Sequence, residues 1–457
     1  MYPVELGEVV DIIGGVPHNV NRGELVLGVS TDSREVGKGD LFFAIKGERF
    51  DGHAFVVDAV RSGAVAVVVD RVLDMNLPFV VVDDVPGAML LFACRYASRF
   101  NPVLVAVTGS FGKTTTKELI SAGLSEAFRV VKAPKSFNNV IGLSKTLFSV
   151  DGDTDYVVVE LGTNHPGEIA RLVEHLWIDD LVVTAVGKTH VGNFGSVDAI
   201  LKEKLSALSR LKPDGKLFVN IDNPYLKGCD FGRRFYAYGS SQGANFRIES
   251  VRNMGFEGFC VSVRLPDGAL VEVKPSILGT FNASNVAVAV AVGWAEGIDP
   301  RILVHGIEGY RGIQGRMNCW RSAEGFYLID DSYNANPDAV RAAVDTLVGL
   351  PARRRIAVVG DMLELGEFSE VEHVEVGRYI AERGVDEVWA TGNFKESVLR
   401  GVALASGETK VRLFEGNDAV VEFARDYLRD GDVVLVKGSR ACAMEQIVKG
   451  IGGLSRC

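Results

Sequence analysis

Thr108-Gly109-Ser110-Phe111-Gly112-Lys113-Thr114-Thr115-Thr116 decides the fold, because this stretch joins an apolar run to a helical pattern through a glycine-rich turn. The run before it, Val103–Val107, is typical of a buried parallel strand. After it, Leu119, Ile120 and Leu124 fall on one face of a helix. Strand, glycine loop and helix in this order are the context that a phosphate-binding loop requires. The alternative is an ordinary glycine-rich turn of an α/β protein, which Gly-Lys-Thr in this context disfavours.

The chemistry of such a loop follows from its residue types. Glycines let backbone amides turn toward phosphate oxygens, and the helix N-terminus adds positive potential. Lys113 would neutralise phosphate charge, and the Thr114 hydroxyl would bind Mg²⁺. The loop departs from the full pattern, because Val107 takes the place of the first glycine. We expect the ATP phosphates to contact Gly109, Ser110, Phe111, Gly112, Lys113, Thr114 and Thr115.

Two further side chains follow predicted strands and suggest a metal site. Glu160 stands near the end of the apolar run Tyr156–Leu161, and His190 follows the run Leu181–Ala185. Carboxyl ends of parallel strands meet at one edge of a sheet, and Mg²⁺ prefers oxygen ligands. Each residue alone could be structural, Glu160 as a surface acid and His190 as an ordinary histidine. Beside a phosphate loop, we interpret both as catalytic metal ligands.

The alternation of strand and helix patterns indicates an α/β protein of three domains, residues 1–84, 85–313 and 314–457. The first predicts a small α/β unit, and the second a doubly wound parallel sheet. Residues 233–275 carry strand-like runs without a helix and predict an antiparallel insertion. The third segment restarts the alternation and predicts a second open sheet. Its expected strands are Phe326–Ile329, Ile356–Val359, Glu387–Ala390 and Val433–Val436.

Composition bounds the function. A net charge of −10 disfavours a nucleic-acid partner, although backbone amides can still bind a small anion. The six cysteines form no CxxC pair, which predicts reduced structural thiols. We find neither a signal peptide pattern at the first residues nor an apolar run of membrane-spanning length. The expectation is a soluble cytoplasmic protein.

Together these motifs resemble the Mur ligase family. Thr31-Asp32-Ser33-Arg34 and Lys46-Gly47-Glu48-Arg49-Phe50-Asp51-Gly52-His53 are similar to its uridine-nucleotide domain. Phe281-Asn282-Ala283-Ser284-Asn285 resembles the His-Asn-x-x-Asn helix start near the adenine, with Phe in place of His. Gly315-Arg316 resembles the arginine at the start of the third domain, and Lys204 aligns with the lysine that the family carbamylates. The resemblance implies a uridine-nucleotide domain, a central P-loop domain and a Rossmann-like C-terminal domain.

The third domain resembles the MurF type. Its signatures are Asp330–Asp338, Gly360–Glu367 and Lys437–Arg440, joined by Ser136-Phe137-Asn138-Asn139 in the central domain. By this resemblance, the ATP site adds Asn282, Arg316, Asp331 and Asn334. The UDP-substrate set is Thr31, Ser33, Arg34, Lys46, Asn138 and Asn139. The dipeptide side is Asn336, Lys437, Ser439 and Arg440. The metal ligands are Thr114, Glu160, His190 and Lys204 as a carbamate.

The implied reaction is ATP-dependent ligation of D-alanyl-D-alanine to a UDP-muramoyl tripeptide in peptidoglycan precursor synthesis. It implies ATP, two Mg²⁺ ions, small-molecule substrates and a monomer. The third residue of the tripeptide, meso-diaminopimelate or lysine, stays open. Two positions depart from the MurF pattern. No acidic residue follows His190 closely, and the common Asn-Asn-Glu is Asn-Asn-Val at Val140.

Other functions compete with this interpretation. A MurE-type ligase would carry an Asp-Asn-Pro-Arg selector, which the sequence lacks, and folylpolyglutamate synthetase lacks the first domain. A P-loop switch or transporter ATPase would show a clear Walker B run or an ABC-type signature, and neither is evident. A non-catalytic nucleotide-binding scaffold would not need His190 and Lys204 beside Glu160.

Overall fold

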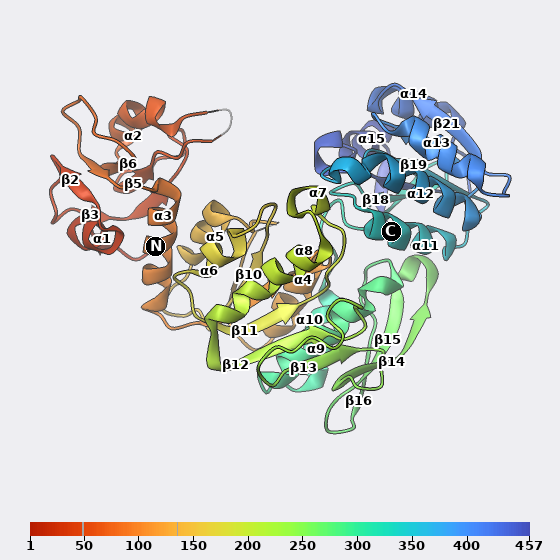
Figure 1. Cartoon of the computed structure of the whole chain (residues 1–457), viewed down its shortest axis with the longest axis horizontal. Helices are drawn as coiled ribbons and strands as arrows, with labels where there is room; N and C mark the ends of the chain where they lie inside the picture. Colours follow the sequence, from red (N-terminus) through yellow and green to blue (C-terminus); the bar gives the residue numbers. More distant parts are fainter. Residues whose placement is uncertain (48–49, 135) are drawn as a thin grey trace.

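The computed structural model describes residues 1–47, 50–134 and 136–457, which form three main β-sheets in chain order (Figure 1). In Figure 1 the central part of the chain lies between the N-terminal part and the C-terminal part. The α/β class and the three-part architecture are confirmed. The domain boundaries that we propose, 84/85 and 313/314, fall in segments between the sheets.

The N-terminal sheet has five strands in the order β2-β7-β6-β5-β4, parallel except for β2. Its parallel strands are buried apolar runs, as expected for strands covered on both faces. Glu48 and Arg49 of the quoted motif lie outside the described residues. The elements are β1 (Val4–Glu5), α1 (Leu6–Ile13), β2 (Val16–His18), β3 (Leu25–Val26), β4 (Gly28–Ser30), β5 (Asp40–Phe43), η1 (Gly52–Phe55), α2 (Val56–Ser62), β6 (Ala66–Val69), β7 (Phe79–Val81) and the connecting helix α3 (Val85–Ser98).

The central sheet has nine strands in the order β16-β15-β14-β13-β12-β11-β8-β10-β9. Strand β13 pairs in parallel with both neighbours, so it extends the main sheet, and the antiparallel pairs are β14 with β15 and β15 with β16. The expected insertion is therefore confirmed only in its later part. The elements are β8 (Val103–Thr108), α4 (Lys113–Leu124), β9 (Val130–Lys132), α5 (Val140–Leu147), β10 (Tyr156–Leu161), α6 (Glu168–Val173), β11 (Ile178–Val183), α7 (Val191–Phe194), α8 (Val197–Leu205), η2 (Ser206–Arg210), β12 (Leu211–Asn220), β13 (Tyr236–Gly239), β14 (Phe246–Asn253), η3 (Gly255–Glu257), β15 (Phe259–Arg264), β16 (Leu270–Val273), η4 (Thr280–Asn282), α9 (Ala283–Ala295) and α10 (Pro300–Gly309).

The C-terminal sheet has seven strands in the order β21-β20-β19-β22-β18-β17-β23, with β17 and β23 antiparallel at one edge. The order reverses between β19 and β22, and such a switch point opens a crevice at the carboxyl ends of the strands. The elements are β17 (Asn318–Ser322), β18 (Tyr327–Asp331), α11 (Pro337–Val348), β19 (Arg354–Val359), η5 (Gly366–Phe368), α12 (Ser369–Glu382), β20 (Glu387–Thr391), α13 (Lys395–Leu404), β21 (Lys410–Phe414), α14 (Asn417–Tyr427), β22 (Asp432–Lys437), η6 (Arg440–Cys442), α15 (Glu445–Ile451) and β23 (Leu454–Arg456).

One cysteine pair contradicts the expectation of six reduced thiols. Strand β23 pairs with β17 and brings the last residue, Cys457, beside Cys319, with which it forms a disulfide. The two residues are 138 positions apart, so no local spacing could have indicated the bond. The other four cysteines are free thiols. Within the described ranges, no helix is both long and apolar enough to cross a membrane.

A buried carboxyl in β11 predicts a pH-dependent stability. Asp180 is fully buried, and its nearest cation is Lys216, whose Nζ lies 3.6 Å from Oδ1. Burial and the neighbouring Glu296 charge raise the pKa of Asp180 to about 8. The unfolded value is about 3.9, so the folded state binds more protons between these values. This group's contribution to the free energy of unfolding therefore falls as the pH rises from about 4 to about 8.

We expect Asp180→Asn to remove that fall, because an amide cannot ionise. The measurement is the thermal midpoint of wild type and variant between about pH 5 and pH 8.5, where the wild type should lose more stability than the variant. Asp153→Asn is the matched control, since that carboxylate is 78% exposed. Parallel midpoint curves for the wild type and Asp180→Asn would contradict the prediction.

Candidate active site

A cavity of about 880 Å³ lies between the central and C-terminal domains and holds most of the predicted site residues. Its walls come from the carboxyl ends of both sheets and from the helices that begin there. Clefts between domains and at switch points are the usual places for ligands in such folds. The cavity includes the phosphate loop, Glu160, His190 and the segment that follows β18.

Hydrogen bonds to neighbouring residues fix the conformation of the phosphate loop. Gly109 has a φ of +146°, and a Cβ there would lie 2.1 Å from Thr184 Oγ1, so only glycine fits. Thr184 donates from Oγ1 to the Phe111 carbonyl at 2.6 Å, and the Ser110 amide donates to the Ala185 carbonyl at 2.7 Å. These bonds fix the loop against the segment that directly follows β11. Its remaining amides can therefore meet an anion at the start of α4.

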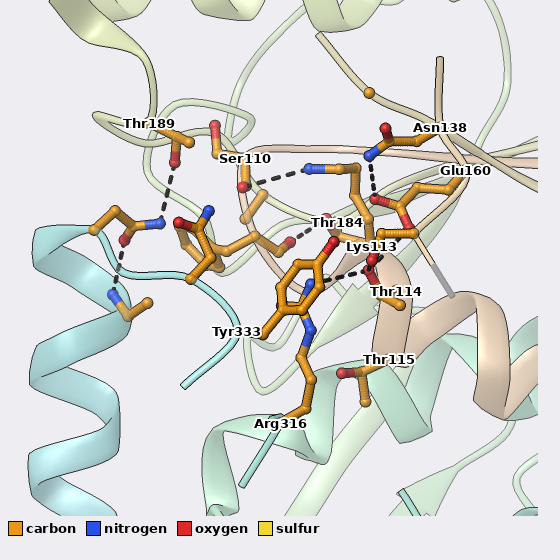
Figure 2. Close-up of a pocket in the computed structure, with 18 of the residues that line it drawn as sticks. Ser110, Lys113, Thr114, Thr115, Asn138, Glu160, Thr184, Thr189, Arg316 and Tyr333 are labelled. Carbon is orange, nitrogen blue, oxygen red and sulfur yellow. Dashed lines mark hydrogen bonds between the residues drawn. The ribbon is translucent and has the colours of Figure 1, made fainter. Parts of the chain in front are cut away.

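Lys113 begins α4 and turns back over the loop, where its Nζ donates to the Gly109 carbonyl at 2.6 Å. Its longer bond to the Ser110 carbonyl, at 3.5 Å, is drawn in Figure 2. Burial lowers the pKa of Lys113 below its ordinary value, while Glu160 opposes that shift. Its Nζ therefore lies within the loop, and its role in charge compensation stays a prediction.

Glu160 is the centre of a polar cluster at the end of β10 (Figure 2). It accepts from Thr114 Oγ1 at 2.8 Å and from Asn138 Nδ2 at 3.0 Å. Arg316, from the C-terminal domain, donates to Thr114 Oγ1 at 3.2 Å. A hydroxyl and a carboxylate oxygen this close fit the hard-oxygen preference of Mg²⁺. In the described part of the chain, no three His, Cys, Asp or Glu side chains form a metal cluster, so further ligands would come from phosphate, water or a modified residue.

His190 reaches the cavity from the N-cap of α7, in a left-handed conformation with a φ of +59°. Its Nδ1 bonds Oε2 of Glu364 in the C-terminal domain. The hydrogen bond from His190 lowers the pKa of Glu364. Glu364 was quoted within a family motif but was not predicted as a site residue. The motif itself, Gly360–Glu367, was the signal that could have identified it.

Lys204 lies in α8 and is 2% exposed. It is not among the residues that line the cavity. It nevertheless lies close enough to Lys113 and Glu160 for both charges to shift its pKa. Burial, followed by the positive charge of Lys113, lowers the pKa of Lys204 well below its ordinary value. Lys204 is therefore not an exposed surface lysine of the helix, and its carbamylation stays a prediction.

The predicted nucleotide side chains Asn282, Arg316, Asp331 and Asn334 all line the cavity. Asn282 donates to the Leu278 carbonyl at 2.9 Å and accepts from Asn285, whose Oδ1 binds Thr116. This chain of bonds ties the start of α9 to the phosphate loop. Arg316 lies 4.4 Å from the ring centre of Tyr333, a residue that the sequence did not single out.

The residues predicted for the dipeptide side differ in their freedom to bind a ligand. Lys437 donates to Asp331 Oδ2 at 2.5 Å and to the Asn334 carbonyl at 3.0 Å, so it holds the segment after β18. Asn336 caps α11 and reaches Thr189 at 3.3 Å. Ser439 accepts from the Leu363 amide and donates to the Ala335 carbonyl. Arg440, with a side chain 63% exposed, faces Tyr333 at 5.6 Å.

The predicted UDP-substrate residues form two groups. Asn138 and Asn139 line the cavity, where Asn139 caps α5. Thr31, Ser33, Arg34 and Lys46 belong to the N-terminal domain, apart from the cavity walls. Arg34 bonds both oxygens of Asp32, and those bonds lower the pKa of Asp32 to about 2.

Family models match most of the chain. They are described as Mur ligase family, catalytic domain (residues 26–89), Mur ligase middle domain (107–293) and Mur ligase, glutamate ligase domain (315–440). The chain is 34% identical to the UDP-N-acetylmuramoyl-tripeptide--D-alanyl-D-alanine ligase of Escherichia coli, and the match covers 100% of both chains.

Solved structures agree with this likeness. A crystal structure of MurF from Acinetobacter baumannii matches with a TM-score of 0.90, at 28% identity and over 98% of both chains. MurF ligase from Thermotoga maritima in complex with ADP matches with a TM-score of 0.81, at 27% identity, over 93% of this chain and 97% of that one.

Proposed function

Because the chain belongs to the Mur ligase family, and to its MurF type, we propose that it joins D-alanyl-D-alanine to a UDP-muramoyl tripeptide with ATP as the energy source. The single observation that carries this proposal is the meeting of Thr114, Glu160 and Arg316 in one cavity. A phosphate loop, a metal-type carboxylate and an arginine of the C-terminal domain meet there, which is the set of groups that a transferring phosphoryl group requires.

The reaction begins by activating a carboxylate, which is a poor electrophile because its oxygen would leave as a dianion. Transfer of the γ-phosphoryl group of ATP gives an acyl phosphate and ADP. The amine of the dipeptide then attacks the acyl carbon, a tetrahedral intermediate forms, and phosphate leaves as the amide bond is made. The protein positions the groups and compensates charge through Lys113 and the loop amides.

The family implies ATP and Mg²⁺. We propose Thr114, Glu160 and His190 as metal ligands, with Lys204 as a carbamate that adds a further carboxylate. When bound, Mg²⁺ compensates the charge of the phosphates. We also propose that the N-terminal domain binds the uridine nucleotide through Thr31, Ser33, Arg34 and Lys46. The enzyme would act as a cytoplasmic monomer.

The hydrogen bonds that the predicted dipeptide-side residues already make within the protein limit the roles we propose for them. Lys437, Asn336 and Ser439 already hold protein groups, so we propose that they position the segment after β18 and the start of α11. Arg440 pairs with Glu445 at 3.2 Å, but its side chain is 63% exposed, far more than that of Lys437. It therefore remains the candidate for the carboxylate of the dipeptide.

Acceptor choice tests the proposed function. We expect D-alanyl-D-alanine to be used far better than any single free amino acid, because the C-terminal motifs are those of the MurF type. The measurement is competition between the dipeptide and either meso-diaminopimelate or L-lysine, each with its matching UDP-muramoyl precursor, with products identified by mass spectrometry. A preference for a single diamino acid would assign the chain to the MurE type.

Phosphate release separates the remaining alternatives. A ligase should release phosphate at a high rate only when the tripeptide precursor and the dipeptide are both present. A nucleotide switch or transporter ATPase would hydrolyse ATP without either substrate, and a scaffold would not turn over in any mixture.

A further inference from the structure

The contact between His190 and Glu364 joins the central and C-terminal domains across 174 residues of sequence. The histidine side chain is largely buried, at 17% exposure, and its ring nitrogen Nδ1 bonds the carboxylate directly. The sequence offered no acidic residue close after His190, where the MurF pattern has one. In space, the C-terminal domain supplies that carboxylate.

The bond determines which ring nitrogen carries the proton. A carboxylate only accepts hydrogen bonds, so Nδ1 of His190 must donate, and a neutral ring then keeps its lone pair on Nε2. Among the described residues, Nε2 has no hydrogen-bond partner. Histidines that bind metals commonly donate their other ring N–H to a carboxylate, which orients the ring and raises its basicity.

The two residues in contact share an uncommon backbone conformation. His190 and Glu364 both have a left-handed backbone, with φ values of +59° and +63°. This conformation is uncommon for residues other than glycine and is found where the surroundings enforce it. The Gly192 amide donates to the Glu364 carbonyl at 3.4 Å. A Cβ on Gly192 would lie 2.8 Å from the Gly366 nitrogen, so the two loops approach as closely as glycine allows.

Two neighbours of His190 also contact the C-terminal domain. Lys188 Nζ lies 2.7 Å from Glu372 Oε1, and Thr189 Oγ1 accepts from Asn336 Nδ2 at 3.3 Å. The segment 188–192 therefore rests on the C-terminal domain through side chains and backbone. If that domain moved away, His190 would lose the carboxylate that orients it.

We propose that Glu364 is a positioning residue, which reaches from the C-terminal domain to orient His190 and leaves its Nε2 free for a divalent cation. This rests on the proposed function, since it gives His190 a role at the metal. In this structure, the carboxylate that orients His190 comes from the C-terminal domain, which also contacts Lys188 and Thr189.

The test compares Glu364→Ala, which removes the acceptor, with Glu364→Gln, whose amide oxygen can still accept. Glu367→Ala is the matched control, because Glu367 lies three residues away in the same motif and is exposed. The first readout is the ring ¹⁵N signals of His190 in ligand-free enzyme at about pH 8, where a free imidazole is neutral. His190→Gln assigns the signals. The second readout is the affinity for Mn²⁺ in the presence of ADP.

We expect wild type and Glu367→Ala to show His190 protonated at Nδ1, and Glu364→Ala to lose that preference. Mn²⁺ affinity should fall by about 10- to 100-fold in Glu364→Ala, as for other residues that orient a metal ligand. Glu364→Gln should recover part of both. Unchanged ring signals and Mn²⁺ affinity in Glu364→Ala would overturn the proposal. Neither readout needs ligation, so a failure of the proposed function would appear separately, as wild-type enzyme that makes no amide.

Discussion

Lys113→Ala should lower the rate of ligation by about 100- to 1000-fold, the usual effect of removing one group that stabilises developing charge. Lys113 is the lysine of the phosphate loop, and its Nζ lies within the loop at 2.6 Å from the Gly109 carbonyl. Without it, the transferring phosphoryl group loses a protein cation that compensates its charge. The measurement is kcat for amide formation at saturating concentrations of ATP and both other substrates.

The thermal midpoint of Lys113→Ala should change little, because the lysine side chain binds loop carbonyls rather than filling a core. Lys227→Ala, which removes an exposed lysine of the same domain, should retain full activity. Near-normal ligation by Lys113→Ala would refute the assignment of the phosphate loop. A large drop in its thermal midpoint would instead mean that lost activity reflects unfolding.

The sequence predicted the strands that are buried on both faces better than the half-buried strands. Strands covered on both faces, such as Val103–Thr108 and Asp432–Lys437, read as apolar runs and were predicted within a residue or two. Strand β21, Lys410–Phe414, lies at a sheet edge, is half-buried and alternates apolar with charged residues. It carried too weak a pattern to be identified. Strand β17 was missed for a different reason: it is mostly buried, but its sequence, Asn-Cys-Trp-Arg-Ser, contains no apolar run.

The features of the candidate site also differ in whether the sequence could place them. Glu160 could be placed because a carboxylate near the end of a parallel strand must face the loop that follows the neighbouring strand. The Glu364 contact with His190 and the Cys319–Cys457 bond could not be placed. Both join positions more than a hundred residues apart, and only the packing of whole domains or sheet edges brings them together. Local patterns carry no such information.

The surroundings of Lys204 make the charged form of its side chain unfavourable. An ammonium group that is 2% exposed and lies near the charge of Lys113 is costly, because burial removes hydration and the neighbouring cation repels it. The lowered pKa favours the neutral amine, which is the form that reacts with carbon dioxide. The amine nitrogen bonds the carbon of carbon dioxide and releases one proton. The cation is thereby replaced by a carboxylate.

We therefore expect Lys204→Ala to lose activity by about 100-fold or more if this group is a metal ligand, since a carboxylate would be missing beside the phosphates. Lys202→Ala, two residues earlier in the same helix and exposed, is the control and should remain active. Formate or acetate should partly restore Lys204→Ala, because either can supply a carboxylate in the space that the side chain leaves. Neither should affect Lys113→Ala.

The modification itself can be observed apart from activity. Wild-type enzyme equilibrated with ¹³C-bicarbonate should show a carbamate carbon signal by NMR, and that signal should be absent from Lys204→Ala and present in Lys202→Ala. Removal of carbon dioxide should lower wild-type activity, and bicarbonate should restore it. Full activity of Lys204→Ala, or a wild-type enzyme that takes up no label, would contradict the carbamate. Lys204 would then be an unmodified lysine, and the burial that lowers its pKa would shift its equilibrium toward the neutral amine.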